Sequence, residues 1–159
     1  LANAIGFLGY LVFALSPLAR DRGKYLWSHA AAMVPIAAHY VLLDALSGAL
    51  LSLSYMAADA VALRWPNRRM PLLLVGVGAT VATALAWSGP ADLMGLGGTL
   101  IFMASRFAKT HFQTLLVAGG STVLWGLYGW TQGSISQVIF SAAYAVFCLV
   151  RMVIILQRR

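Results

Sequence analysis

One acidic side chain, Asp59, lies well inside an apolar stretch of the sequence that runs from about residue 49 to residue 64. An unpaired carboxylate in an apolar environment is costly, so this side chain must be paired, protonated or in contact with water. Two interpretations are open. Asp59 could bind a proton, a cation or a positive group of a solute, or it could form an internal ion pair with Arg106 or Arg64.

Polar side chains recur at helical spacing along two apolar stretches, and this spacing places them on one face of each helix. In the stretch that ends the chain they are Gln137, Ser141, Tyr144, Cys148 and Arg151. In the stretch from 49 to 64 the corresponding residues are Ser52, Met56, Asp59 and Leu63. Polar groups in a membrane helix turn away from lipid, so both faces should point inward. They could line a path for a solute, or, for Ser52 and Cys148 above all, they could join neighbouring helices.

Aromatic residues mark the end of two further stretches. Trp125 and Tyr128 are three residues apart and share a helical face, followed by a short turn that contains Gly133. A weaker copy of this pattern runs from Tyr40 through Gly48 to Met56. Tyr40 and Trp125 could form facing walls for a flat or ring-shaped solute, or they could belong to an interfacial aromatic belt.

The chain contains three histidines, and one of them, His39, could take part in proton transfer. His39 precedes Tyr40, near the end of an apolar stretch. It could relay a proton or serve as a hydrogen-bonded packing residue. His29 and His111 lie near basic turns, and we expect them at the surface.

The composition indicates a membrane protein. Of the 159 residues, 61% are hydrophobic and 9% are charged, which is too little polar surface for a soluble domain. The net charge of +7 comes from basic residues between apolar stretches, so it points to membrane orientation rather than to nucleic acid. The sequence contains no paired-carboxylate, Ser-His or metal-ligand motif, so we expect no enzyme activity, no metal and no cofactor.

Seven apolar stretches are long enough, or nearly long enough, to cross a bilayer, which takes about 20 residues. They run over residues 2–19, 25–43, 49–64, 70–87, 91–108, 112–130 and 134–156. Pro17 near the end of the first and Pro35 inside the second are expected to bend these helices and act as hinges. The sequence therefore predicts an all-α, polytopic membrane fold with seven transmembrane helices.

An internal repeat divides the chain. Small and aromatic residues recur in order in the two halves, and the matched pairs are Gly6 with Gly95, Gly9 with Gly98, Tyr40 with Trp125 and Gly48 with Gly133. The repeat predicts a triple-helix bundle over 1–69, a linker helix over 70–90 and a second triple-helix bundle over 91–159. The two bundles are parallel because one span separates them.

The charges provide an independent test of the seven-span topology. With seven spans, all 11 Lys and Arg residues fall on one side, whereas Asp44 and Asp92 fall on the other. Because basic residues concentrate on the cytoplasmic side, we expect the N-terminus outside and the C-terminus in the cytoplasm.

The sequence resembles two known families, one through short runs of residues and the other over nearly its whole length. The run from Val123 to Gly129, with Ile5-Gly6-Phe7 followed by Ser16-Pro17, resembles the repeat of SWEET and SemiSWEET transporters in the PQ-loop superfamily. Nearly the whole chain is similar to the YgjV-type bacterial inner-membrane proteins, through its first basic turn, His39 to Leu43, and Gly133 to Ile135. The resemblance implies two triple-helix bundles around a central solute path in a bacterial inner membrane.

Transport of a small polar solute by alternating access between the two bundles is therefore our leading hypothesis. The residues expected along the path are Tyr40, Ser52, Asp59, Trp125, Tyr128, Gln137, Ser141 and Tyr144, with Asp59 or His39 as a possible site of ion or proton coupling. The expected partners are the lipid bilayer and an unknown solute, and the chain could act as a monomer or a homodimer. The alternative is a membrane receptor, assembly factor or lipid-binding scaffold, which could fill the central space with Met56, Phe140 and Leu63.

Overall fold

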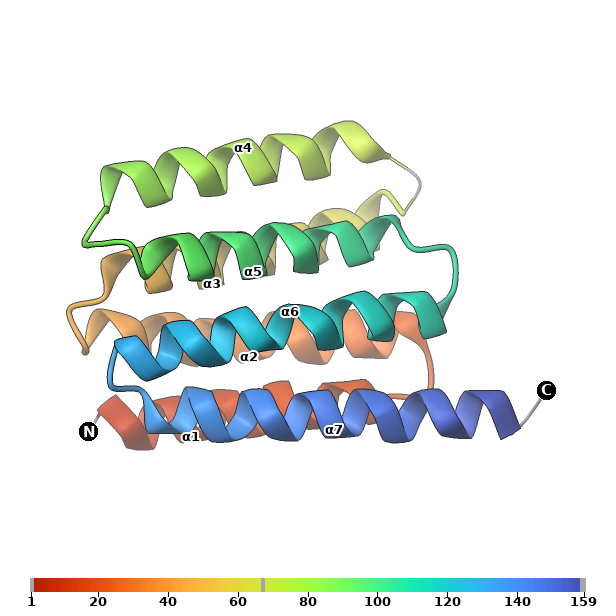
Figure 1. Cartoon of the computed structure of the whole chain (residues 1–159). Coiled ribbons are helices and arrows are strands. Elements are labelled where there is room, and N and C mark those ends of the chain that lie inside the picture. Colours follow the sequence, from red (N-terminus) through yellow and green to blue (C-terminus); the bar gives the residue numbers. More distant parts are fainter. Residues whose placement is uncertain (1, 67, 158–159) are drawn as a thin grey trace.

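Seven α-helices make up the chain in a computed structural model, which describes residues 2–66 and 68–157 and contains no strand in that part of the chain (Figure 1). The elements are α1 (Ala2–Leu15), the 3-10 helix η1 (Ser16–Leu18), α2 (Arg22–Val41), α3 (Leu46–Arg64), α4 (Arg69–Leu85), α5 (Asp92–Ala104), the 3-10 helix η2 (Ser105–Phe107), α6 (His111–Thr131) and α7 (Ile135–Gln157). The predicted all-α class is confirmed. Each predicted stretch matches one helix, or a helix with its 3-10 extension, and the first and last residues differ by three positions or fewer.

The helices pack in two layers, with α1, α2 and α3 in one and α5, α6 and α7 in the other (Figure 1). The layers meet along two edges, where α1 packs against α7 and α3 packs against α5. The six helices therefore form a closed ring, and α4 lies outside it against α3 and α5. Few residues of α4 are buried, and these are Leu72, Ala79 and Thr83.

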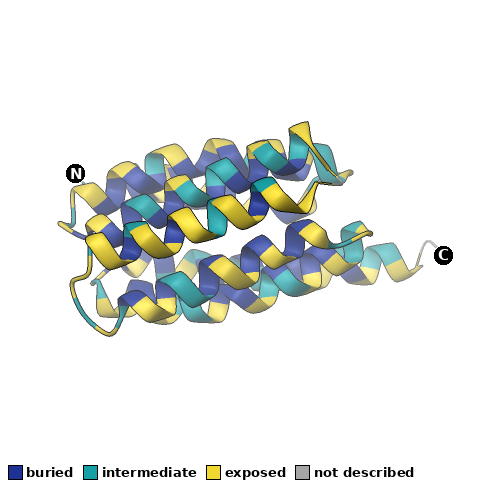
Figure 2. Cartoon of the chain, turned by 90° about the horizontal axis from the view of Figure 1, so that it is seen from above, coloured by how far each residue is buried: buried dark blue, intermediate teal, exposed yellow. Residues whose placement is uncertain are grey.

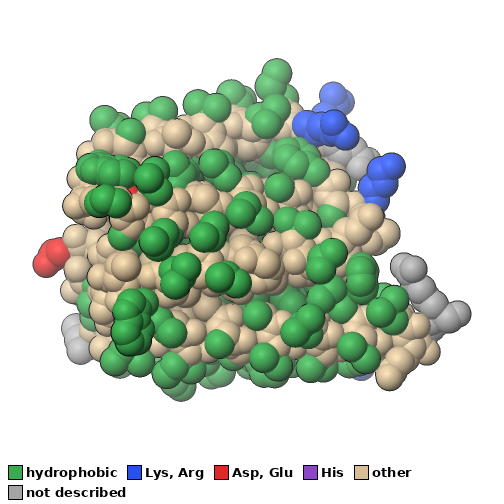
Figure 3. Space-filling view, in the orientation of Figure 1, with side chains coloured by type: hydrophobic (Ala, Val, Ile, Leu, Met, Phe, Trp, Pro, Cys, Tyr) green, Lys and Arg blue, Asp and Glu red, His purple; other side chains and the backbone are tan. Residues whose placement is uncertain are grey.

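Buried residues face the inside of this ring, and exposed residues face outward (Figure 2). The outward side chains are largely apolar (Figure 3). By length and apolar composition, α3 and α7 are able to cross a membrane, whereas α1 with η1 and α4 are apolar but shorter. The seven-span topology is thus supported for two helices and stays a prediction for the others.

The Lys and Arg side chains visible in Figure 3 gather at one end of the ring. The described Lys and Arg residues lie in or beside the η1–α2, α3–α4 and η2–α6 turns and in the second half of α7. We call this the basic end. The other end, here called the acidic end, carries Asp44 and Asp92, and no described basic residue lies there.

Side-chain caps fix where two helices start at the basic end. Asp21 precedes α2 and accepts a hydrogen bond of 2.8 Å from the backbone N–H of Lys24, which lowers the pKa of the Asp21 carboxyl. Thr110 precedes α6 and accepts from the N–H of Gln113 at 3.2 Å. At the acidic end, Gly133 adopts a positive φ of 68° in the turn between α6 and α7, a conformation that glycine adopts without strain.

Candidate functional site

A cavity of about 20 Å³, with room for about one water molecule, lies inside the ring of helices. Aromatic and small polar side chains line it, and none of them is charged. The lining residues are Tyr10, Phe13, Met33, Ile36, Ser52, Tyr55, Phe102, Ser121, Thr122, Trp125 and Gln137. The open space is narrow and suits water rather than a ring-sized solute. Three of the residues predicted for the path, Ser52, Trp125 and Gln137, are therefore brought together here.

A hydrogen-bonded chain lies beside the cavity, toward the acidic end. The Tyr40 hydroxyl donates to Oε1 of Gln137 at 3.3 Å, and Nε2 of Gln137 donates to Oγ of Ser141 at 2.7 Å. The Tyr40 ring lies 6.1 Å from that of Trp125 and 5.6 Å from that of Tyr128, measured between ring centres. The predicted aromatic pair thus meets, as two tilted rings in contact with each other.

The acidic end of the ring is closed by a second set of polar contacts. Ser47 at the start of α3 donates to the carboxylate of Asp92 at the start of α5, and its Oγ lies 2.9 Å from the hydroxyl of Tyr128. The backbone N–H of Ser88 also donates to Asp92, at 2.7 Å. Tyr40, Ser47, Asp92, Tyr128 and Gln137 are called the acidic-end cluster below. Sequence reasoning placed Asp92 at this end but assigned it no partner.

His39 also lies at the acidic end, where it joins three helices. Its Nδ1 donates to the carbonyl oxygen of Ala2 in α1 at 2.9 Å, and its Nε2 accepts from the hydroxyl of Ser134, just before α7, at 2.8 Å. Both ring nitrogens are therefore paired, and the side chain is fully buried. Paired nitrogens fit the packing interpretation of His39, and a role in proton coupling stays a prediction.

Asp59 lies on the other side of the cavity, between a cation and a histidine. Its carboxylate pairs with the guanidinium of Arg106 in η2, and its Oδ2 lies 2.6 Å from Nδ1 of His29. All three side chains are buried, and the Arg106 guanidinium stacks 3.9 Å from the centre of the Phe102 ring. The internal ion pair with Arg106 is therefore the one that forms, whereas Arg64 lies elsewhere, over the ring of Trp65.

The expectation that His29 lies at the surface is wrong, because the side chain is fully buried. Helix α2 begins at Arg22, three residues earlier than predicted, so His29 lies two turns inside it and faces Asp59. His111, expected at the surface for the same reason, is half-buried at the start of α6.

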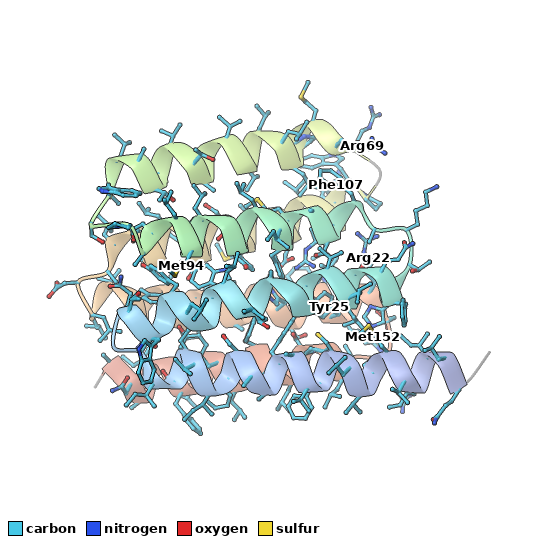
Figure 4. All side chains as sticks on the ribbon, viewed as in Figure 1. Arg22, Tyr25, Arg69, Met94, Phe107 and Met152 are labelled. Atoms are coloured by element: carbon cyan, nitrogen blue, oxygen red, sulfur yellow. The ribbon has the colours of Figure 1, made fainter. Side chains whose placement is uncertain are left out.

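Two tyrosines complete the polar contacts near the basic end, and one of them, Tyr25, lies close to Arg22 (Figure 4). The hydroxyls of Tyr25 in α2 and Tyr144 in α7 lie 2.6 Å apart, and Nη1 of Arg106 donates to Tyr25 at 3.4 Å. Arg22 donates to the backbone carbonyl of Arg106 at 2.7 Å. Tyr25, His29, Asp59, Arg106 and Tyr144 are called the basic-end cluster. Tyr144, predicted for the path, thus lies in this cluster and does not line the cavity.

The predicted hinge prolines lie outside both clusters. Pro17 is buried in η1, and Pro35 lies within α2, where the helix continues through it. A Cβ at Gly9 of α1 would meet Cγ of Pro35 at 2.9 Å, so α1 and α2 approach closely there. A hinge role for either proline stays a prediction.

A ring of helices with a largely apolar outer surface, and with its Lys and Arg residues gathered toward one end, is the architecture of a helical membrane protein. The chain belongs to the Imp-YgjV family, described as bacterial inner membrane protein, whose model matches residues 1–159. No curated protein and no solved structure matches the chain. The family supports the predicted inner-membrane location, whereas the resemblance to SWEET and PQ-loop transporters stays a prediction.

Proposed function

We propose that this chain moves a small polar solute across the inner membrane by alternating access. The observation that carries the proposal is the central cavity, which lies between two closed polar clusters. A transporter must open such a cavity to one side at a time, and contacts like those of Asp92 and Asp59 are the ones that would separate. In this proposal Ser52, Trp125 and Gln137 contact the solute.

The helix packing supports two equivalent halves. In the repeat, α1, α2 and α3 correspond to α5, α6 and α7. The contact of α1 with α7 then matches that of α5 with α3, and the contact of η1 with α7 matches that of η2 with α3. The halves of the proposed transporter are residues 1–69 and 91–159, with 70–90 as the linker outside the ring. One chain holds both halves, so a monomer is sufficient.

The proposed topology predicts that Asp44 and Arg68 lie on opposite sides of the membrane, with Arg68 in the cytoplasm. Single cysteines at these positions, in a Cys148→Ser background, should differ in their reaction with a membrane-impermeant maleimide added to intact cells. We expect position 44 to be labelled in intact cells, and position 68 to be labelled only after the cells are lysed. Labelling of both positions from one side would exclude the seven-span topology.

A solute that binds the cavity must raise the thermal stability of the purified protein. We expect at least one compound in a panel of sugars, nucleosides, amino acids and organic cations to do so, with a gain of about 2.7 kcal/mol at 100 times its Kd. The matched variants are Trp125→Leu, at a position 6% exposed on the cavity, and Trp130→Leu, at a position 75% exposed on the same helix. The gain should be lost in the first variant and kept in the second.

A lipid-binding scaffold is the alternative that one observation favours. An outward groove between α2 and α3 has apolar walls with Arg64 at its edge, and its lining residues are Trp27, Ala30, Ala31, Val34, Met56, Ala60, Leu63 and Arg64. Met56 and Leu63, expected to fill the centre of a scaffold, therefore lie on this groove instead. This alternative would be favoured if no compound in the panel raised the thermal stability of well-folded protein and if lipid stayed bound during purification.

A further inference from the structure

One ring nitrogen of His29 has no partner among the described residues. The Asp59 carboxylate is ionised because it pairs with the Arg106 guanidinium, so it can only accept hydrogen bonds. Nδ1 of His29 must therefore carry a hydrogen and donate to Asp59. In the neutral ring Nε2 then has a free lone pair, and this buried atom makes no hydrogen bond with a described residue. A buried acceptor without a donor is uncommon and costly, so it calls for an explanation.

The same ring packs behind the wall of the central cavity, against three aromatic side chains, and does not itself line the open space. It stacks on Phe102 at 4.5 Å and on Tyr55 at 5.7 Å, and it meets Phe13 at 5.2 Å, all between ring centres. These three aromatic side chains line the cavity. His29 is therefore placed between the cavity and the Asp59–Arg106 ion pair, where it can respond to what enters the cavity and act on the ion pair.

The charges around His29 come from Asp59 and Arg106. Tyr25 of α2, Tyr55 of α3 and Tyr144 of α7 face the same space with neutral hydroxyls, whereas α1 and α5 present Phe13 and Phe102. With a neutral His29 the cluster has no net charge, because one carboxylate balances one guanidinium. A proton on Nε2 gives it a net positive charge in a desolvated place, which is unfavourable unless a cation leaves.

We propose that Nε2 of His29 is a proton-binding site and that its protonation opens the Asp59–Arg106 pair. The imidazolium then competes with the guanidinium for one carboxylate. Arg106 is the cation able to leave, since it lies on the short helix η2 at the basic end, whereas His29 is held within α2. The proton comes from water that enters the cavity, and no covalent bond other than N–H is formed. This inference rests on the proposed transport function and makes a proton the coupling ion.

His39 provides a matched control inside the same chain. It is as deeply buried as His29, but both of its ring nitrogens are hydrogen-bonded, to the Ala2 carbonyl and to the Ser134 hydroxyl. It has no free lone pair and lies at the acidic end, away from Asp59. A variant at His39 changes a buried histidine without changing the proposed proton site.

Opening at the basic end can be followed through the native Cys148, without knowledge of the solute. This buried residue lies one turn beyond Tyr144 on the same face of α7, toward the basic end. The full-length protein in lipid nanodiscs would be treated with a water-soluble thiosulfonate between pH 5 and pH 8. Each rate is divided by the rate for unfolded protein at the same pH, which removes the chemistry of the thiol itself.

We expect the corrected rate at Cys148 to rise as the pH falls, by up to about tenfold per pH unit, the limit for one proton. His29→Gln should abolish this rise, because an amide still donates to Asp59 but does not titrate, whereas His39→Gln should keep it. ¹⁵N spectra of labelled histidines, assigned by loss of signal in His39→Gln and His111→Gln, should show His29 gaining a proton over the same pH range.

A flat rate in the wild type, an equal rise in His29→Gln, or a His29 that stays neutral throughout would overturn the proposal. If His29→Gln does not fold, the wild-type histidine spectra decide the case. The double variant Asp59→Asn/Arg106→Gln should label fast at every pH. If the labelling rate responds to pH but no compound in the thermal screen binds, the proton site is supported and the transport proposal is rejected. If a compound binds but the labelling rate does not respond to pH, the transport proposal is supported and the proton site is rejected.

Discussion

Asp59→Asn is expected to lower the free energy of unfolding by about 3–5 kcal/mol, the usual loss when one partner of a buried ion pair is removed. The reason is the charge left behind. Arg106 is buried, and its guanidinium is ionised under all ordinary conditions. Without the carboxylate of Asp59, that charge remains in an apolar interior with only hydroxyl groups and aromatic faces around it.

Unfolding in mixed detergent micelles, followed by tryptophan fluorescence, measures this loss. The matched control is Arg64→Gln, which removes an exposed cation at the end of the same helix and should change stability by less than about 1 kcal/mol. The double variant Asp59→Asn/Arg106→Gln removes both charges and should recover most of the stability. A double variant as unstable as Asp59→Asn would mean that hydrogen bonds, and not the unpaired charge, account for the loss.

The expected recovery bears on why the ion pair is there. Replacing a whole buried ion pair by neutral groups is often harmless to stability, so Asp59 and Arg106 add little to a static protein. They do tie α3 to η2 at the basic end, and this contact is either made or broken. A contact of this kind suits a protein that alternates between two arrangements better than one with a fixed core.

The helices and their inward faces could be predicted from the sequence because both follow from local periodicity. Gln137, Ser141, Tyr144 and Cys148 all prove to be buried on α7, as their spacing requires. The choice between Arg64 and Arg106 as the partner of Asp59 could also have been made from the sequence. Arg64 is five residues further along the same helix and therefore lies on a different face, whereas Arg106 on another element is free to approach.

The polar clusters could not be predicted in the same way, since they join residues far apart in the chain. His29 meets Asp59 because α2 packs against α3, and Tyr25 meets Tyr144 because α1 and η1 bring α7 to the start of α2. Helical periodicity fixes which face of a helix is buried but does not fix which helix lies opposite. A shift of three residues in where α2 begins was enough to misplace His29 at the surface.

Gly98 provides a second test of the cavity, through the close approach of two helices. A Cβ at this position of α5 would lie 2.6 Å from Cδ1 of Trp125 and 3.3 Å from the backbone carbonyl of Ser121, both on α6. The carbonyl cannot yield without moving α6, and the Trp125 ring, which lines the cavity, would have to shift as well. Small residues let two membrane helices approach closely, and the structure places Gly98 at such a contact.

Gly98→Ala should therefore lower the free energy of unfolding by about 1–3 kcal/mol, the usual cost of overpacking, and should also weaken solute binding. Gly78→Ala on the outer helix α4 is the control, because a Cβ there meets nothing within 4 Å. It should stabilise the protein by about 0.5–1 kcal/mol through helix propensity and leave binding unchanged. Both effects are measured by the same detergent unfolding and thermal screen. If Gly98→Ala behaves as Gly78→Ala does, the Trp125 ring moves into the cavity without cost, and the cavity is a packing defect rather than a binding site.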